Sequence, residues 1–250
     1  MIHSFLLIGQ SNMAGRGRLD EAIALNTKNI VTLRNGRWQG LFRPINPDRP
    51  FSGTNLGESF ASRYAEKYGV TVGLICCADG GTSLSQWQPG GLLFDNAVYQ
   101  ARLAQRTSTI AGVLWHQGEA DCSPELYATY RQRFLPIMQA LRKELDLYDV
   151  PFLLGGLGDY LKDCKLSDNL KNYAHVNSAL MQIANEEEKT GFVSAAGLTS
   201  NPDYLHFNAA SLHEFGIRYF NEYEKQKDPN KQFFEKPEQD FAVRTAMEQL

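Results

Sequence analysis

The sequence predicts an α/β protein in which a mainly parallel sheet is covered by helices on both faces. Short and almost wholly apolar runs recur along the chain, as expected for strands that are buried on both sides. Longer segments with apolar residues at helical spacing lie between these runs. Strands and helices therefore alternate, which is the arrangement that places helices over both faces of a parallel sheet.

Five such strands are expected, with helices between them. The strands cover residues 2–8, 70–77, 110–115, 150–156 and 192–195. The helices cover residues 56–68, 92–106, 124–141, 170–183 and 212–219. Pro136 is expected to kink the third of these helices. Asn35-Gly36 between apolar flanks predicts a small surface hairpin.

The composition is that of an ordinary globular protein, and it excludes several functional classes. The net charge is −3, and no run of Lys or Arg marks a nucleic-acid surface. No segment approaches the roughly 20 apolar residues that span a bilayer. Residues 2–8 lack the features of a signal peptide, so we expect a cytoplasmic protein. The four cysteines have no zinc-ligand spacing, and we expect them to be reduced, with no metal or other cofactor.

The domain organisation is expected to be one domain followed by a tail. Residues 1–224 contain all the alternating strands and helices, and no internal repeat is visible. Residues 225–250 are charged and lie beyond the last of these units. Within this tail, Ala242 to Leu250 is expected to form a short helix that packs on the body or on a neighbouring subunit of a homo-oligomer.

The stretch that organises the function is residues 9–15, Gly-Gln-Ser-Asn-Met-Ala-Gly, which follows directly on the first strand. An apolar strand that ends in glycine and continues with small polar residues predicts a tight turn into a helix. Such a turn holds the hydroxyl of Ser11 beside backbone N–H groups, where negative charge is favoured. This environment suits a nucleophilic serine. On these residues alone, Ser11 is explained equally well as a helix cap.

Polar residues follow other strands as well. They are Gly80-Gly81-Thr82 after the second strand, Gln117 and Glu119 after the third, and Asp203 and His206 on the loop before the last helix. In an open parallel sheet, ligands bind at the carboxyl ends of the strands. We therefore expect these groups to meet Ser11 at one rim of the sheet, which favours the nucleophile over the cap.

Together these residues supply what acyl transfer by a serine requires. His206 can act as the base, and Asp203 lies three residues earlier, where it can receive the Nδ1–H of the imidazole. Glu119 remains an alternative as the carboxylate that orients His206. It can instead line the pocket or hold the loop of Gln117 by hydrogen bonds. The backbone N–H groups of Ser11 and Gly81, with the side-chain amide of Gln117, are candidate donors to the oxyanion.

Four blocks of this sequence resemble the sialate O-acetylesterase and acetylxylan esterase branch of the SGNH hydrolases. The blocks are Gly-Gln-Ser-Asn-Met near the start, Gly-Gly-Thr after the second strand, Trp-His-Gln-Gly-Glu after the third and Asp-x-x-His near the end. They span residues 9–206 in the order and spacing of that family. The resemblance implies a flavodoxin-like, three-layer α/β/α sandwich with a central, mainly parallel five-stranded sheet. Gln117 stands where the wider superfamily usually has Asn, a departure that this branch shares.

The same resemblance implies a function. It assigns Ser11 as the nucleophile, Asp203 and His206 as the rest of a catalytic triad, and Gly81 and Gln117 as oxyanion donors. The expected enzyme is a serine esterase that removes acetyl groups from a carbohydrate through an acetyl-enzyme intermediate. Acetylated xylan fragments are the first expected substrate and acetylated sialic acid the second. The alternatives are a carbohydrate-binding protein on the same fold without turnover, and an enzyme that transfers acetyl groups to sugar acceptors.

Two further residues are candidates for contact with the substrate. Trp87 lies at the end of the glycine-rich loop and can stack on a sugar ring, or it can pin the loop instead. His116 ends the third predicted strand, where it can touch the substrate or serve a structural purpose.

Overall fold

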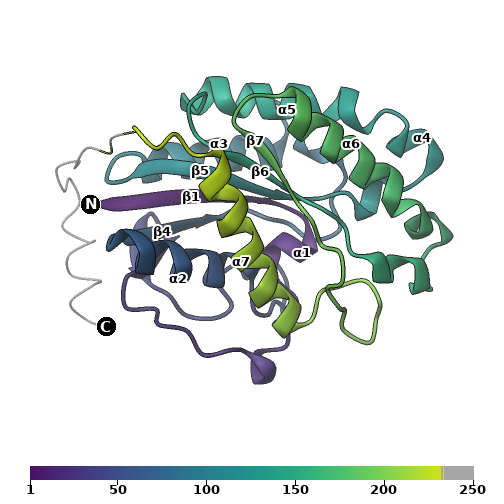
Figure 1. Ribbon diagram of the computed structural model, residues 1–250, viewed down its shortest axis with the longest axis horizontal. Coiled ribbons are helices and arrows are strands. Elements are labelled where there is room, and N and C mark those ends of the chain that lie inside the picture. The colour runs from purple at the N-terminus through teal and green to yellow at the C-terminus, as the bar shows by residue number, and fades with distance from the viewer. Residues whose placement is uncertain (232, 234–250) are drawn as a thin grey trace.

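A seven-stranded sheet runs through the centre of the molecule (Figure 1). The structure, a computed structural model, describes residues 1–231 and Phe233. The strands are β1 (Ile2–Gly9), β2 (Ile30–Arg34), β3 (Arg37–Gly40), β4 (Thr71–Cys76), β5 (Thr109–His116), β6 (Phe152–Gly155) and β7 (Thr190–Val193). Their order is β3-β2-β4-β1-β5-β6-β7, and every neighbouring pair is parallel except β2 and β3. The predicted α/β class with a mainly parallel sheet is confirmed.

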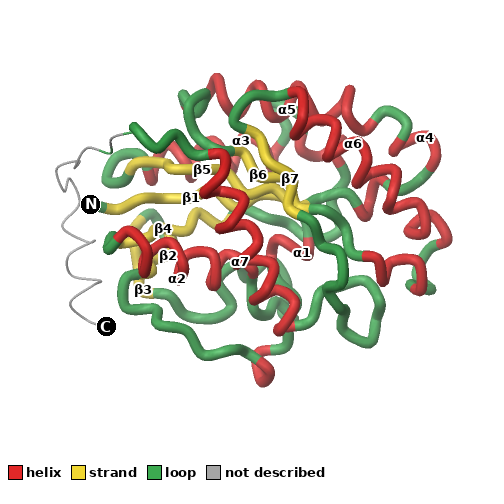
Figure 2. Tube along the Cα trace, in the orientation of Figure 1, coloured by secondary structure: helices red, strands yellow, loops and turns green. Residues whose placement is uncertain are grey.

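The sheet has more strands than the five that the family resemblance implies, because the hairpin at Asn35-Gly36 is part of it (Figure 2). Strand β2 pairs in parallel with β4, and β3 pairs with β2 at the edge of the sheet. Trp38 of β3 is almost fully buried, and a side chain at Gly73 of β4 would come within 2.6 Å of its ring. The bare backbone of Gly73 thus makes room for the indole, and the hairpin extends the sheet instead of standing on the surface.

Helices cover both faces of the sheet. They are α1 (Ser11–Ala14), α2 (Leu56–Tyr68), α3 (Leu92–Ala104), α4 (Pro124–Tyr127), α5 (Tyr130–Leu145), α6 (Tyr173–Glu186) and α7 (Ala209–Gln226). Helices α2 and α7 lie side by side over one face, and α3, α5 and α6 lie over the other (Figure 1). The result is the three-layer α/β/α arrangement that the sequence predicts.

The third predicted helix is divided, and the division does not fall at Pro136. Helix α4 ends at Tyr127 and α5 begins at Tyr130, with Pro136 inside α5. Because proline has no N–H, the carbonyl of Gln132 lacks its usual helical partner at this point. The helix tolerates that loss, and the chain turns at Ala128-Thr129 instead.

Aromatic side chains form the contact between the sheet and the helices on each face. On one face the ring of Phe5 lies 4.7 Å from that of Phe60 and 4.8 Å from that of Tyr64, both in edge-on geometry. On the other face the Trp115 ring lies 4.9 Å from the ring of Phe134. Aromatic pairs of this kind contribute about 0.5–1.5 kcal/mol each beyond the area that they bury. They fix β1 and β5, the two strands on which the site is built.

The loops after β1, β4 and β5 begin side by side, because these strands are neighbours in the sheet (Figure 2). The Gln10 N–H donates to the His116 carbonyl at 2.9 Å, and the Asp79 N–H donates to the Gly9 carbonyl at 3.0 Å. These bonds tie together the first residues of the three loops. The polar stretches that follow the strands therefore start from one rim, as the sequence predicts.

Two further findings concern residues 1–231 and 233 alone. None of their helices is long and apolar enough to cross a membrane. They also contain no group of three or more His, Cys, Asp or Glu side chains that could hold a metal ion. The helix expected over Ala242 to Leu250 lies outside the described residues.

Candidate active site

The turn after β1 brings Ser11 to the rim of the sheet. Gly9 has φ +136°, and a Cβ at this position would lie 2.0 Å from the carbonyl oxygen of His116. Glycine is therefore required for β1 and β5 to approach each other here. Gln10 occupies the N-cap position of α1 and Ser11 is its first residue. The hydroxyl of Ser11 is accordingly not a cap, and it points to another loop.

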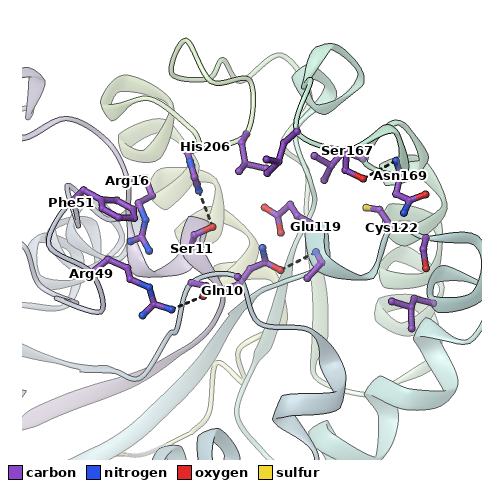
Figure 3. A pocket seen from close by; sticks show the side chains of 18 residues that line it. Gln10, Ser11, Arg16, Arg49, Phe51, Glu119, Cys122, Ser167, Asn169 and His206 are labelled. Atoms are coloured by element: carbon purple, nitrogen blue, oxygen red, sulfur yellow. Dashed lines mark hydrogen bonds between the residues drawn. The ribbon is translucent and has the colours of Figure 1, made fainter.

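That loop carries His206 and Asp203. The Ser11 Oγ lies 3.1 Å from His206 Nε2, and His206 Nδ1 lies 2.7 Å from Asp203 Oδ2 (Figure 3 shows the first of these bonds). Partial burial alone would raise the pKa of Asp203. Hydrogen bonds from the N–H groups of His206 and Leu205 and from the imidazole outweigh burial and lower this pKa. Asp203 is therefore ready to accept the Nδ1–H of His206 as a carboxylate.

Glu119 does not occupy the position beside His206. Its Oε1 accepts a hydrogen bond of 2.5 Å from the Asn12 amide, and none of its hydrogen bonds reaches the imidazole. The Asn12 Oδ1 in turn accepts the N–H of Phe207 at 3.0 Å, and its Nδ2 also donates to the Leu205 carbonyl at 3.2 Å. Asn12 thus connects the turn of Ser11 to both neighbours of His206. Asp203, rather than Glu119, meets the geometric requirement for an orienting carboxylate.

Two backbone donors at the rim have no acceptor within the described part of the chain. They are the N–H groups of Ser11 and Gly81. Gly81 has φ +80°, and a Cβ built on it would meet no atom within 4 Å, so this peptide borders open space. Such unpaired donors beside a nucleophile are the arrangement that stabilises an oxyanion.

A buried ion pair supports the loop that carries Gly81. Arg16 binds Asp48 through two hydrogen bonds of 2.9 and 2.7 Å, and Asp48 also accepts the Gly80 N–H at 2.9 Å. Burial alone would raise the pKa of Asp48, but the hydrogen bonds from Arg16 and from the Ser52 hydroxyl lower it on balance. The carboxylate of Asp48 therefore fixes the position of the glycine loop relative to the turn of Ser11.

The site opens into a cavity of about 540 Å³, with Ser11 and His206 in its wall. Figure 3 shows side chains on both sides of Ser11, with Arg16, Arg49 and Phe51 on one side and Cys122, Ser167 and Asn169 on the other. Leucines 126, 166, 170 and 205 also line this space. The hydroxyl of Ser11 thus has room on both sides, as an ester with an acyl part and an alcohol part requires.

Comparison with known proteins identifies the family. The protein-family model described as carbohydrate esterase, sialic acid-specific acetylesterase, matches residues 1–225 of the chain. The chain belongs to this carbohydrate esterase family. It is accordingly a carboxylic ester hydrolase, as the sequence predicts.

The chain is also similar to relatives of known sequence, and its fold is similar to that of several solved structures. A probable carbohydrate esterase of Arabidopsis thaliana, At4g34215, is 26% identical over 245 residues, which cover 85% of this chain and 86% of the relative. The solved structure of that plant protein superposes with a TM-score of 0.79 at 24% identity, over 90% of this chain and 99% of the other. NanS has a TM-score of 0.71 at 17% identity, over 90% of this chain and 97% of its own. A carbohydrate acetylesterase from Xanthomonas citri has a TM-score of 0.66 at 19% identity, over 90% of this chain and 56% of its own.

In this carbohydrate esterase, Gln117 does not lie where the sequence predicts. The side chain is fully buried, and its amide nitrogen donates to the Thr82 carbonyl at 3.1 Å and to Asp121 Oδ2 at 2.6 Å. Its oxygen accepts the hydroxyl of Tyr130 at 3.0 Å. One amide hydrogen therefore joins the loop after β5 to the loop after β4, the other is used within the loop after β5, and none faces the cavity.

Gln10 presents an amide to the cavity instead. Its oxygen accepts the N–H groups of Gly118 at 3.3 Å and Ala120 at 3.4 Å. Its nitrogen has no acceptor among the residues that the structure describes, and Figure 3 shows it turned to the open space beside Ser11. Residue 10 adjoins Ser11 in the sequence, but a strand-end glutamine carries no pattern that distinguishes this position from that of Gln117.

The two further candidates for substrate contact lie away from the cavity. Trp87 is fully buried and donates its indole N–H to the Thr82 hydroxyl at 3.0 Å, so it pins the glycine-rich loop. His116 is also fully buried, and its Nε2 pairs with the Gly156 carbonyl at 3.2 Å. Burial lowers the pKa of His116 and keeps its imidazole neutral. Both residues therefore support the loops of the site, and neither lines the cavity.

One side of the cavity, built by residues 43–53, is not predicted from the sequence. Arg49 and Phe51 line it, and Asp48 holds the glycine loop from the same segment. Three prolines and one glycine in this segment predict a loop, and they predict nothing about its function. The charged pair Asp48-Arg49 between two prolines is the sequence feature that could have indicated a functional loop here.

Proposed function

We propose that the chain is a serine esterase that hydrolyses O-acetyl groups on a carbohydrate through an acetyl-enzyme intermediate. The observation that carries this proposal is the continuous hydrogen-bonded series from Ser11 through His206 to Asp203, which borders the cavity. A carboxylate can only accept, so His206 Nδ1 carries a proton and donates it to Asp203. The lone pair of Nε2 then faces the hydroxyl of Ser11 and can receive its proton.

The first half of the reaction transfers the acetyl group to the enzyme. Ser11 Oγ attacks the ester carbonyl carbon while His206 takes the hydroxyl proton. The negative charge that develops on the carbonyl oxygen is met by the N–H groups of Ser11 and Gly81. The amide nitrogen of Gln10 takes the place that the sequence assigned to Gln117. When the tetrahedral intermediate collapses, the sugar oxygen leaves with the proton from His206.

The second half releases acetate. A water molecule attacks the acetyl carbonyl and gives one proton to His206, and the second tetrahedral intermediate collapses to release Ser11 Oγ and acetic acid, which loses its remaining proton to solvent and leaves as acetate. The proton on His206 returns to Ser11 Oγ. Asp203 stabilises the imidazolium in both halves and remains ionised throughout.

The proposed substrates are short O-acetylated sugars, namely acetylated xylan fragments or acetylated sialic acid. Support comes from the family description, which is a sialic acid-specific acetylesterase, and from a relative described as a carbohydrate acetylesterase. The two substrates are separated by incubating the enzyme with each acetylated sugar and measuring the acetate released.

The mechanism is tested by comparing Ser11→Ala with the unmodified enzyme on 4-nitrophenyl acetate. Loss of the nucleophile should lower kcat by a factor on the order of 10⁴ or more. Ser178→Ala is the matched control, because this exposed hydroxyl on α6 bonds only within its own helix. Equal rates for Ser11→Ala and the unmodified enzyme would rule out the mechanism.

A further inference from the structure

One carboxylate oxygen in the wall of the cavity has no partner. Glu119 is 7% exposed and lines the cavity, and its Oε2 is buried with no hydrogen-bond donor among the described residues. Burying a carboxylate oxygen without a donor is costly, so such an atom needs an explanation in a native structure. The catalytic series from Ser11 to Asp203 does not use it.

The neighbours of Glu119 determine which of its two carboxylate oxygens lacks a hydrogen-bond donor. Asn12 donates to Oε1 at 2.5 Å, which orients the carboxylate. The imidazole of His116 approaches the same oxygen, with Nδ1 4.0 Å from Oε1, and this Nδ1 has no hydrogen-bond partner among the described residues. Because His116 uses Nε2–H for the Gly156 carbonyl and burial lowers its pKa, its Nδ1 carries a lone pair and gives Glu119 no proton. The protein therefore satisfies Oε1 and leaves Oε2 without a donor.

We infer that Glu119 is a substrate-binding residue whose Oε2 accepts a hydrogen bond from a free hydroxyl next to the acetylated carbon of the sugar. This inference rests on the proposed function and adds a preference within it. Figure 3 shows the carboxylate of Glu119 turned to the same open space as the hydroxyl of Ser11. Because Glu119 lines the same cavity as Ser11 and its bond to Asn12 holds it in place, it is positioned to meet the part of the substrate that adjoins the ester.

Charge places this contact on the alcohol side of the ester. A carboxylate repels the negative charge that forms on the carbonyl oxygen, so Glu119 is unsuited to the oxyanion side. A neighbouring hydroxyl on the leaving sugar is a neutral donor, and it supplies the hydrogen that Oε2 lacks. Hydrogen bonds to charged groups are among the stronger ones in proteins, so the contact should affect turnover by tenfold or more.

The nearly isosteric change Glu119→Gln reverses the polarity of the contact. The amide oxygen of the new side chain should face Asn12 Nδ2, since that group only donates. The amide nitrogen then faces the cavity in place of Oε2, and an acceptor becomes a donor. A donor binds a hydroxyl oxygen and a methoxy oxygen alike, so the variant should no longer distinguish them.

The experiment compares two esters that differ only in this group, trans-2-acetoxycyclohexanol and trans-2-methoxycyclohexyl acetate. The ratio of their kcat/KM values is measured from released acetate for the unmodified enzyme, for Glu119→Gln and for Glu125→Gln. Glu125 is the matched control, since it undergoes the same change of side chain, is exposed on α4 and does not line the cavity.

We expect the unmodified enzyme and Glu125→Gln to prefer the hydroxyl ester by at least tenfold, and Glu119→Gln to show a ratio below about threefold. Turnover of both esters by the unmodified enzyme without a preference overturns the assignment of Glu119 while the esterase function stands. An equal preference in Glu119→Gln and the unmodified enzyme overturns it in the same way. Turnover of neither ester overturns the assignment of Glu119 if the unmodified enzyme still hydrolyses 4-nitrophenyl acetate, and it overturns the proposed function as well if the enzyme does not.

Discussion

Asp203 holds His206 at two points at once. Its Oδ2 lies 2.7 Å from the imidazole Nδ1, and its Oδ1 accepts the backbone N–H of His206 at 3.0 Å. The first bond sets the tautomer of the ring and the second sets the backbone from which the ring extends. A single side chain therefore controls both the orientation and the protonation of the proposed base.

The first prediction concerns Asp203→Asn. The new amide oxygen can keep the backbone bonds to Leu205 and His206, so the loop should retain its shape. The amide nitrogen then faces Nδ1 of His206 as a donor, which moves the imidazole proton to Nε2 and removes the lone pair that Ser11 needs. By analogy with serine hydrolases, kcat should fall by a factor on the order of 10³–10⁴ with KM little changed.

Steady-state kinetics with 4-nitrophenyl acetate measure this effect. Asp168→Asn serves as the control, because Asp168 lies on the surface and pairs with Lys171. A kcat within a few-fold of the unmodified enzyme in Asp203→Asn would show that another group orients His206.

The second prediction compares Gly81→Ala with Gly90→Ala. Both glycines have φ close to +80°, and a Cβ on either one meets no atom within 4 Å. Each variant should lose about 1 kcal/mol of folding stability from backbone strain alone. Only Gly81 offers its N–H to the cavity, so only Gly81→Ala should lose activity, by about 10²-fold or more in kcat. Equal activity in the two variants would remove Gly81 from the oxyanion site.

The third prediction concerns the ion pair under the glycine loop. Asp48→Asn leaves the guanidinium of Arg16 buried without its counterion, and it weakens the bond to the Gly80 N–H. Breaking a buried pair in this way costs about 3–5 kcal/mol of folding free energy. Urea denaturation measures the loss, and kcat should fall as well, because the Gly81 peptide loses its support.

The control for this change is Asp20→Asn. Asp20 forms a similar two-bond pair with Arg18, but both side chains are exposed to solvent. Exposed pairs contribute little to stability. The Asp20 variant should therefore unfold at the same urea concentration as the unmodified enzyme, and a matching loss in both variants would contradict the structural role of Asp48.

The fourth prediction is a pH dependence of stability from His3. Its ring bonds the Tyr64 hydroxyl at 2.8 Å, and burial, followed by the charge of the chain terminus, lowers its pKa from 6.5 to about 4. Between these values the unfolded chain binds a proton that the native protein excludes. The contribution of neutral His3 to the free energy of unfolding is therefore fully present above pH 6.5, and it is lost progressively as the pH falls toward 4.

Denaturation at a series of pH values checks this expectation. His3→Gln removes this one-proton difference between the unfolded and the native protein. The change of unfolding free energy with pH should therefore be smaller in the variant, by up to about 1.4 kcal/mol per pH unit between pH 4 and 6.5. The curve for His3→Gln should thus be flatter than that of the unmodified protein between pH 4 and 6.5. Above pH 7 both curves should have the same slope, and identical slopes throughout would contradict the burial of a neutral His3.

The sequence was sufficient for the strand and helix order and for bringing Ser11, Gly81, Asp203 and His206 to one rim. These predictions succeed because buried parallel strands have a strong apolar signature and their carboxyl ends must meet. Asn35-Gly36 predicts the hairpin, but the sequence does not predict that the hairpin joins the edge of the sheet. That place depends on the match between a large side chain and a glycine far along the chain.

The sequence also does not determine which glutamine, Gln10 or Gln117, presents its amide to the cavity. Both are glutamines at the end of a central strand, and the sequence treats them alike. What separates them is the set of acceptors around each amide, and Asp121 and Thr82 consume both hydrogens of Gln117. Partner sets of this kind arise only from the three-dimensional packing of loops.

The bonds of Asn12 across the chain have a consequence for biosynthesis. Phe207 joins Asn12 over 195 positions of sequence, and Ser11 meets His206 over the same span. The nucleophile therefore leaves the ribosome among the first residues and has no base until nearly the whole domain has been translated. Hydrolytic activity should appear in one step late in synthesis, and fragments that end before residue 206 should release no acetate.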